Sequence, residues 1–293
     1  MYDQFGHVRL GGVAETIANA IEHHTGFETR MVLLGHVQRG GTPTAYDRVL
    51  STRYGVAAID AVHLGAWGSM VALQCNDIVT VPLRETVRKC ARTFASATRM
   101  IDRYPDYRFV CSQAVQYHWM ETQYPALFER IRERVATGQW QPVGGMWVEA
   151  DMNLPSGESI VRQLVHGQRY FESRFGVRCK EVWIPDVFGY PASLPQIFRA
   201  GGCDRFITQK LSWNKQNKFP HSTFKWEGLD GSQVLTHFPP VDTYNAEISP
   251  RELDHATKGF RDHAWSSWSL MPYGYGDGGG GPTREMLERA RRT

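Results

Sequence analysis

The chain has 293 residues, of which 42% are hydrophobic, so it is long enough for one large α/β domain or two smaller ones. Its net charge of +3 is too small to indicate a nucleic-acid or membrane partner, and no window is apolar enough to span a bilayer. The five cysteines form no Cys-x-x-Cys pair and the start shows no signal peptide, so we expect a cytoplasmic protein with reduced thiols.

The first 82 residues predict helices over 12–24 and 45–64, with a short buried strand over 30–35 between them. Gly40 and Gly41 precede the second helix, and a glycine turn at a helix N-terminus lets backbone N–H groups approach an anion. Arg30, His36 and Arg39 add cationic donors near the same turn. The pattern predicts binding of a phosphorylated ligand, and an ordinary Gly-Gly turn is the alternative.

Glu-Thr-Arg at 28–30 and Leu-Gly-His-Val-Gln-Arg-Gly-Gly-Thr-Pro-Thr-Ala-Tyr-Asp-Arg at 34–48 closely resemble the C-terminal third of bacterial ATP-dependent 6-phosphofructokinase. The resemblance runs to about Leu83 and implies that Arg30, His36 and Arg39 hold fructose 6-phosphate. The family's nucleotide loop and catalytic aspartate lie upstream of the matched part, and the chain has no P-loop or kinase-type glycine motif. The implied role of residues 1–82 is sugar-phosphate binding without phosphoryl transfer.

Residues 83–293 alternate between helix-like and strand-like patterns, which predicts a parallel sheet or a barrel. Ser156 suits an N-cap, and Pro250 suits the first position of a helix. We expect helices over 84–102, 122–137, 157–175, 193–200, 250–263 and 283–292, and strands over 107–112, 140–148, 181–185, 205–208, 233–238 and 269–273.

Polar residues stand at the ends of the predicted strands, where α/β barrels place their chemistry. They are Ser112, Gln113, Glu149, Asp151, Asp186, Gln209, Lys210, His237 and Asp277. For Glu149 and Asp151 the alternative is bonding to neighbouring backbone, and for His237 it is a satisfied core histidine.

One of these residues, Asp186, ends an apolar run and precedes a Phe-Gly turn with aromatic flanks, an arrangement that suits a sugar-processing enzyme. A surface aspartate at the start of a loop is the alternative. Eight of the nine tryptophans follow Pro82, which favours a sugar-binding role for that part, although tryptophan also fills large cores.

Six stretches resemble the catalytic domain of glycoside hydrolase family 38, the α-mannosidases. They lie at 111–114, 142–149, 153–159, 183–190, 208–214 and 274–283, and include Trp-Ile-Pro-Asp-Val-Phe-Gly-Tyr and Gly-Tyr-Gly-Asp-Gly-Gly-Gly-Gly-Pro-Thr. The resemblance implies an incomplete (β/α) barrel over 83–293. It also implies a retaining, zinc-dependent glycosidase that acts on terminal α-mannosides of oligosaccharides.

The resemblance also assigns roles to single residues. Asp186 matches the nucleophile, which is also a zinc ligand, and Asp277 best matches the acid/base region. Phe188 matches an aromatic wall residue, Lys210 a cation that stabilises the nucleophile's negative charge, and Tyr244 a sugar contact. In retaining chemistry the two carboxyl groups lie ~5 Å apart, and zinc grips sugar hydroxyls.

The sequence departs from the family at its metal site. The His-x-Asp pair that ligates zinc falls on Gln74 and Asn76, whose neutral amides are poor zinc ligands. The family's remaining histidine ligand is expected beyond Thr293. Of the four expected zinc ligands, we therefore expect only Asp186 to be present.

The simplest account is a chimera joined near residues 81–83, in which the strand-like run 70–81 stands in for the missing barrel strand. We expect impaired α-mannosidase activity. The alternatives are a sugar-phosphate-binding fragment of phosphofructokinase lineage and a catalytically inactive fusion.

Overall fold

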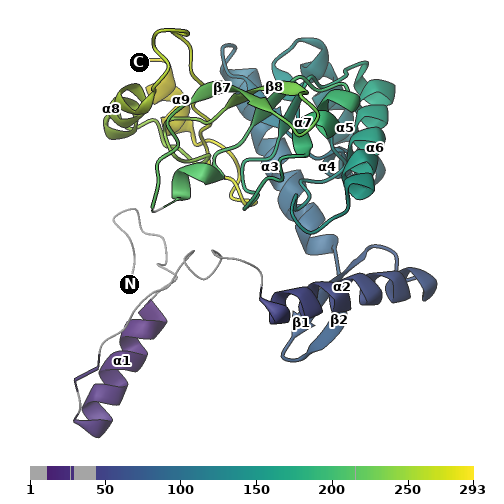
Figure 1. The fold of residues 1–293 in the computed structure, drawn as a ribbon, viewed down its shortest axis with the longest axis vertical. Helices are drawn as coiled ribbons and strands as arrows, with labels where there is room; N and C mark the ends of the chain where they lie inside the picture. The colour runs from purple at the N-terminus through teal and green to yellow at the C-terminus, as the bar shows by residue number, and fades with distance from the viewer. Residues whose placement is uncertain (1–11, 27, 30–43, 215) are drawn as a thin grey trace. The chain divides into compact units, whose positions relative to one another are not determined.

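The computed structural model describes residues 12–26, 28–29, 44–214 and 216–293, and the chain divides into two compact units, Met1–Val56 and Ala57–Thr293. Helix α1 (Gly12–Thr25) lies in the first unit, and α2 (Ala45–His63) begins there and continues into the second (Figure 1). Both helices were predicted within two residues of these bounds. The predicted strand over 30–35, together with Arg30, His36 and Arg39, lies outside the described residues.

Residues 69–82 fold into an antiparallel hairpin of β1 (Ser69–Gln74) and β2 (Asp77–Pro82). Gln74 pairs with Asp77, so Cys75 and Asn76 form a two-residue turn, and Cys75 has the positive φ of 57° that such turns require. The expectation that residues 70–81 form one strand in place of a barrel strand is therefore wrong, because the turn folds the run back on itself.

Two short sheets lie at the centre of the second unit. In the smaller sheet, β3 (Phe109–Cys111) pairs parallel with β4 (Trp140–Pro142). The larger has the order β5 (Glu181–Trp183), β6 (Arg205–Ile207), β8 (Gln233–His237) and β7 (Thr223–Glu227), with β7 antiparallel to β8 and the other pairs parallel. The predicted mixed α/β class is confirmed, and the described strands do not close into a barrel.

Helices surround these sheets, with α5 and α6 at one end and α8 and α9 at the other in Figure 1. Their bounds are α3 Arg84–Arg103, α4 Ala114–Gln123, α5 Pro125–Ala136, α6 Gly157–Phe175, α7 Leu194–Ala200, α8 Pro250–Gly259 and α9 Arg284–Ala290, with a 3₁₀ helix, η2, at Lys210–Trp213. No described helix is both long and apolar enough to cross a membrane.

The fold differs from the sequence expectations in several elements. Helix α4 and strand β7 were not predicted. The strand expected over 140–148 ends at Pro142, because Gly144 and Gly145 take positive φ values of 86° and 66°. The expectation of a strand over 269–273 is wrong. In the structure, Tyr273 forms only an isolated β-bridge with Ala246.

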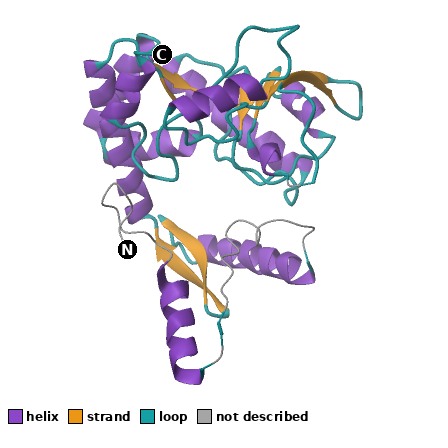
Figure 2. Cartoon of the chain, turned by 90° about the vertical axis from the view of Figure 1, so that its left-hand side faces the viewer, coloured by secondary structure: helices purple, strands orange, loops and turns teal. Residues whose placement is uncertain are grey.

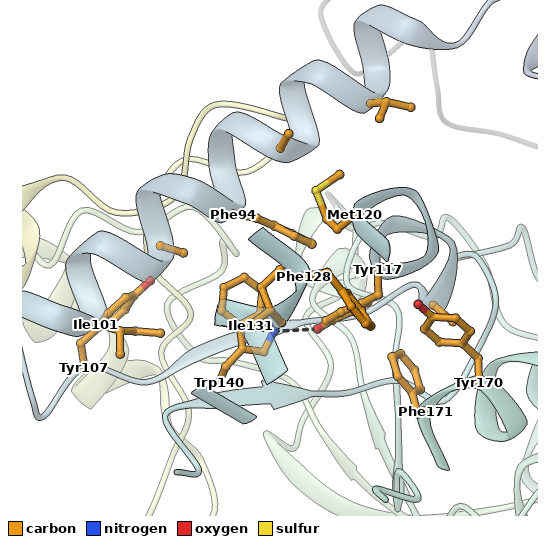
Figure 3. Close-up of a cluster of buried hydrophobic side chains, with 14 of the residues drawn as sticks. Phe94, Ile101, Tyr107, Tyr117, Met120, Phe128, Ile131, Trp140, Tyr170 and Phe171 are labelled. Atoms are coloured by element: carbon orange, nitrogen blue, oxygen red, sulfur yellow. Dashed lines mark hydrogen bonds between the residues drawn. The ribbon is translucent and has the colours of Figure 1, made fainter. Parts of the chain in front are cut away.

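An aromatic core joins α3, α4, α5 and the smaller sheet (Figure 3). The Trp140 Nε1–H donates to the Tyr117 hydroxyl at 2.9 Å, and that hydroxyl donates to the Cys111 carbonyl at 2.8 Å. The Phe94 ring lies edge-on to Trp140, with centroids 5.0 Å apart. Since both polar atoms are satisfied, the buried Tyr–Trp pair fixes the strand that leads into Ser112.

Helix α6 connects this core to a second one. Ser156 accepts a hydrogen bond from the Ser159 N–H at 3.3 Å, which confirms the predicted N-cap. Ile160 and Leu164 pack in the second core, and Phe171 packs in the first. The helix also holds the segment before Glu149, because the Trp147 N–H donates to the Gln163 carbonyl at 3.0 Å.

Candidate active site

A cavity of about 1570 Å³ runs along the strands of the second unit, and its lining includes both ends of β5 and β6 as well as residues that follow the strands. Loops connect most of the short strands and helices in Figure 2, and loop residues supply much of the cavity wall. The polar residues among its lining include Ser112, Gln113, Glu149, Asp186, His237, Tyr244 and Asp277. The structure therefore brings most of the predicted strand-end residues to one cavity.

Asp186 lies three residues after the last residue of strand β5, and its Oδ1 atom forms an ion pair with Lys210 Nζ. The contact has the distance of an ion pair but not the angles of a hydrogen bond. The Lys210 side chain is 3% exposed, whereas that of Asp186 is 42% exposed. The ammonium group is thus buried, and the carboxylate still reaches solvent in the cavity.

Three aromatic rings surround the Lys210 ammonium. Its Nζ lies 3.3 Å from the Trp213 ring centroid, 4.7 Å from that of Phe188 and 5.5 Å from that of Tyr244. Aromatic faces attract a desolvated cation, at roughly 2 kcal/mol for a favourable contact. Trp213 was not among the predicted site residues, although its spacing of three from Lys210 places both on η2.

Tyr244 is one of the three rings around Lys210, and it also lines the cavity with Asp186 and Asp277. Burial raises the pKa of the Tyr244 hydroxyl well above its usual range, and the negative charges of Asp186 and Asp277 raise it further. The tyrosine is therefore a neutral hydroxyl that donates hydrogen bonds in this part of the cavity.

Glu149 is a further carboxyl group in the cavity, which the sequence placed at a strand end without assigning it a catalytic role. The Ser112 hydroxyl donates to Glu149 Oε1, so this side chain bonds across to β3 instead of to neighbouring backbone. Burial raises the pKa of Glu149 to about 7; the Ser112 hydrogen bond opposes the rise, and the charges of Asp186 and Asp277 add to it.

For two other strand-end residues the structural alternative holds. Asp151 Oδ2 accepts from the backbone N–H groups of Asn153 at 3.2 Å and Leu154 at 2.7 Å. His237 Nδ1 lies 2.9 Å from the Thr223 hydroxyl, and its Nε2 accepts from the Leu270 N–H at 3.3 Å. Burial lowers the pKa of His237, so it is a neutral, satisfied histidine in the cavity wall.

Asp277 sits in a glycine-rich loop with a φ of 53°, in the left-handed region that non-glycine residues seldom adopt. Two long-range bonds hold the loop: the Gly276 N–H donates to Asn245 Oδ1 at 2.9 Å, and Arg92 Nη2 donates to the Gly278 carbonyl at 2.7 Å. Such a conformation persists only where the surroundings enforce it, and it is typical of functional sites.

The side chains that the structure describes do not fit a zinc ion. No group of three or more His, Cys, Asp and Glu side chains that could hold a metal occurs in the described parts of the chain. An oxygen of Asp186 already faces the Lys210 ammonium, which would compete with a cation. Gln74 and Asn76, at the positions of two expected ligands, are exposed in the β1–β2 hairpin.

Comparison with known proteins separates the chain into two lineages. Residues 79–293 match the glycosyl hydrolases family 38 N-terminal domain, and residues 4–62 match phosphofructokinase. Alpha-mannosidase G of Dictyostelium discoideum is 55% identical over 205 residues, 70% of this chain and 19% of that protein. Alpha-mannosidase 2C1 of Homo sapiens is 53% identical over 211 residues, 72% of this chain and 20% of that protein.

The first part of the chain has different relatives. Pyrophosphate–fructose 6-phosphate 1-phosphotransferase of Amycolatopsis mediterranei is 64% identical over 83 residues, 28% of this chain and 24% of that protein. The chain spans about a fifth of the length of the mannosidases and about a quarter of this phosphotransferase.

Among solved structures, an alpha-mannosidase from Enterococcus faecalis aligns over 72% of this chain and 25% of its own, with a TM-score of 0.59 and 17% identity. A 4-alpha-glucanotransferase from Thermococcus litoralis aligns over 65% of this chain and 30% of its own, with a TM-score of 0.50 and 12% identity. These likenesses support the fold. The chain is a chimera that belongs to glycosyl hydrolase family 38 through residues 79–293 and carries a phosphofructokinase-like segment before them.

Proposed function

We propose that residues 83–293 form the mannoside-binding part of a retaining α-mannosidase site, joined near residues 81–83 to the phosphofructokinase-like segment of residues 1–82. The observation that carries this proposal is the Asp186–Lys210 pair, enclosed by three aromatic rings and open to a cavity that also holds Asp277. Aromatic walls suit the apolar face of a sugar ring, and the carboxyl groups suit its hydroxyls and its anomeric carbon.

Five of the predicted residues take roles in this site. Asp186 is the nucleophile, whose carboxylate oxygen forms a bond to the anomeric carbon while the bond to the leaving oxygen breaks. Asp277 gives that oxygen its proton and later takes one from the attacking water. Lys210 holds the nucleophile in place, and Phe188 and Tyr244 contact the sugar.

Zinc assists the chemistry in this family, and the side chains in the described parts of this chain do not provide a set of zinc ligands. We infer that the chain retains no stoichiometric zinc after dialysis and that its hydrolysis of terminal α-mannosides is strongly impaired. Elemental analysis of the dialysed protein, alongside hydrolysis of an aryl α-mannoside, tests this. Stoichiometric zinc together with turnover would overturn the inference.

Sugar binding is tested separately from turnover. Saturation-transfer NMR with methyl α-mannoside should detect binding that weakens in Asp186→Asn and Tyr244→Phe. Asp254→Asn is the matched control, because Asp254 lies on the exposed side of α8 and pairs with Lys258. Equal binding by all four proteins would remove Asp186 from the site.

The phosphotransferase relatives favour a second candidate function, binding of fructose 6-phosphate by Arg30, His36 and Arg39. Calorimetry with fructose 6-phosphate should show binding that Arg39→Ala abolishes and that Arg99→Ala, a change at an exposed position of α3, leaves intact. If neither this sugar phosphate nor the mannoside binds, the chain is an inactive fusion.

The compartment follows from the thiols. All five cysteines are free in the structure, which is the usual state in a reducing environment. We place the protein in the cytoplasm, and sugars, not nucleic acids or membranes, are its ligands.

A further inference from the structure

The segment between α8 and the Asp277 loop exposes two tryptophans. Trp265 is 89% exposed and Trp268 is 84% exposed, although tryptophan is usually highly buried. A single exposed apolar side chain is ordinary, so the position of each tryptophan relative to the cavity decides its significance. The proposed catalytic chemistry uses neither residue.

Hydrogen bonds hold both ends of the segment from Trp265 to Leu270, so the backbone that carries the two indoles is fixed. At one end, the Trp265 N–H donates to the Asp262 carbonyl at 2.9 Å. Asp262 is 4% exposed, and its carboxylate accepts from the Ser222 N–H at 2.6 Å and the Thr223 N–H at 2.8 Å, at the start of β7. At the other end, the Leu270 N–H donates to His237 at the end of β8.

The two tryptophans differ in one respect. Trp268 lines the same cavity as Asp186 and Asp277, together with Ser266 and Ser269, whereas Trp265 is not among the lining residues. The exposed Trp268 indole offers an apolar surface at the cavity wall. The Ser266 hydroxyl donates to the Trp268 carbonyl at 3.1 Å and so helps to hold the backbone beneath that surface. A pyranose ring, with an apolar face and hydroxyls around its rim, is complementary to that surface.

We propose that Trp268 forms a subsite for a second sugar ring of an extended α-mannoside, next to the ring held at Asp186. The inference rests on the proposed function for the identity of the first ring. The cavity itself supports this occupant, because Asp186, Asp277 and Trp268 all line it. The subsite makes the protein prefer oligosaccharides to monosaccharides.

The test compares two ligands, methyl α-mannoside and α-mannobiose, by calorimetry on the full chain. Wild type should bind α-mannobiose at least tenfold more tightly than methyl α-mannoside. Trp268→Ala should remove about tenfold of that affinity, the usual cost of a central aromatic contact, and should leave methyl α-mannoside binding unchanged. Trp265→Ala is the matched control, since it removes an equally exposed indole from the same segment but outside the cavity.

The outcomes separate the two proposals. If methyl α-mannoside binds but the disaccharide gains nothing, or if Trp265→Ala and Trp268→Ala act alike, the subsite is wrong and the proposed function stands. If only longer mannosides bind, and Trp268→Ala abolishes that binding, the subsite stands without the Asp186 assignment. If Trp268→Ala changes the sedimentation coefficient and not sugar affinity, the indole packs against protein and the subsite is wrong.

Discussion

Glu149 makes the stability of this protein depend on pH, and replacing it with glutamine should remove that dependence. Its carboxyl group is buried beside Ser112 and shares the cavity with Asp186 and Asp277. Burial raises its pKa from 4.5 to about 7, so the folded protein keeps a proton that the unfolded chain has lost at mildly acidic pH.

The sign and size of the pH effect on the unfolding free energy follow from the difference between the folded and unfolded pKa of Glu149. Below the unfolded pKa of 4.5 both states hold the proton, and the favourable contribution of Glu149 is fully present. As the pH rises toward and through about 7, the folded state must bury an ionised carboxylate, so that contribution is lost. A pKa difference of about 2.5 corresponds to about 3 kcal/mol of unfolding free energy at 1.36 kcal/mol per pH unit.

Urea unfolding followed by circular dichroism at pH 4, 6 and 8 measures this directly. Between pH 4 and pH 8 the wild type should lose about 3 kcal/mol of unfolding free energy that the Glu149→Gln variant retains. Ser112→Ala removes the hydrogen bond that favours the carboxylate, so its loss should be larger than that of the wild type. Glu158→Gln is the matched control, because Glu158 is exposed and pairs with Arg162 on the surface of α6. Parallel pH profiles for wild type and Glu149→Gln would refute the reasoning.

The Asp186–Lys210 pair should respond unequally to its two truncations: Asp186→Asn leaves a buried ammonium and costs about 3 kcal/mol, whereas Lys210→Met leaves a solvated carboxylate and costs about 1 kcal/mol. Urea unfolding of both variants measures the order, and the reverse order would contradict the burial argument. Replacing two helical glycines with alanine should shift the midpoint of thermal unfolding in opposite directions. Gly167→Ala places a Cβ 2.3 Å from the Met146 backbone and costs about 3 kcal/mol, while Gly55→Ala meets nothing within 4 Å and should stabilise α2 by roughly 0.5–1 kcal/mol. Equal effects at the two glycines would show that the contact with Met146 is relieved.

Local signals were sufficient for much of this protein. The bounds of α6 follow from Ser156 at its N-cap and from Gly176, whose φ of 65° ends the helix. The motif around Asp186 and the glycine-rich run at 276–281 identify the lineage, because the residues of each are adjacent in the chain. The junction near residues 81–83 stays a prediction from the point where the two resemblances meet; the two family matches end at residue 62 and begin at residue 79.

Other features depend on residues far apart in the chain, and these only the tertiary structure decided. The β1–β2 hairpin depends on cross-strand pairing around Cys75, which an alternating apolar pattern does not reveal. Glu149 becomes a site residue through Ser112, which lies 37 positions away. Trp213 joins the site because Lys210 is buried beneath its ring. A sequence shows which groups can carry charge or stack; which of them lose water and face one another depends on packing, because desolvation and Coulomb energies are set by distance in space.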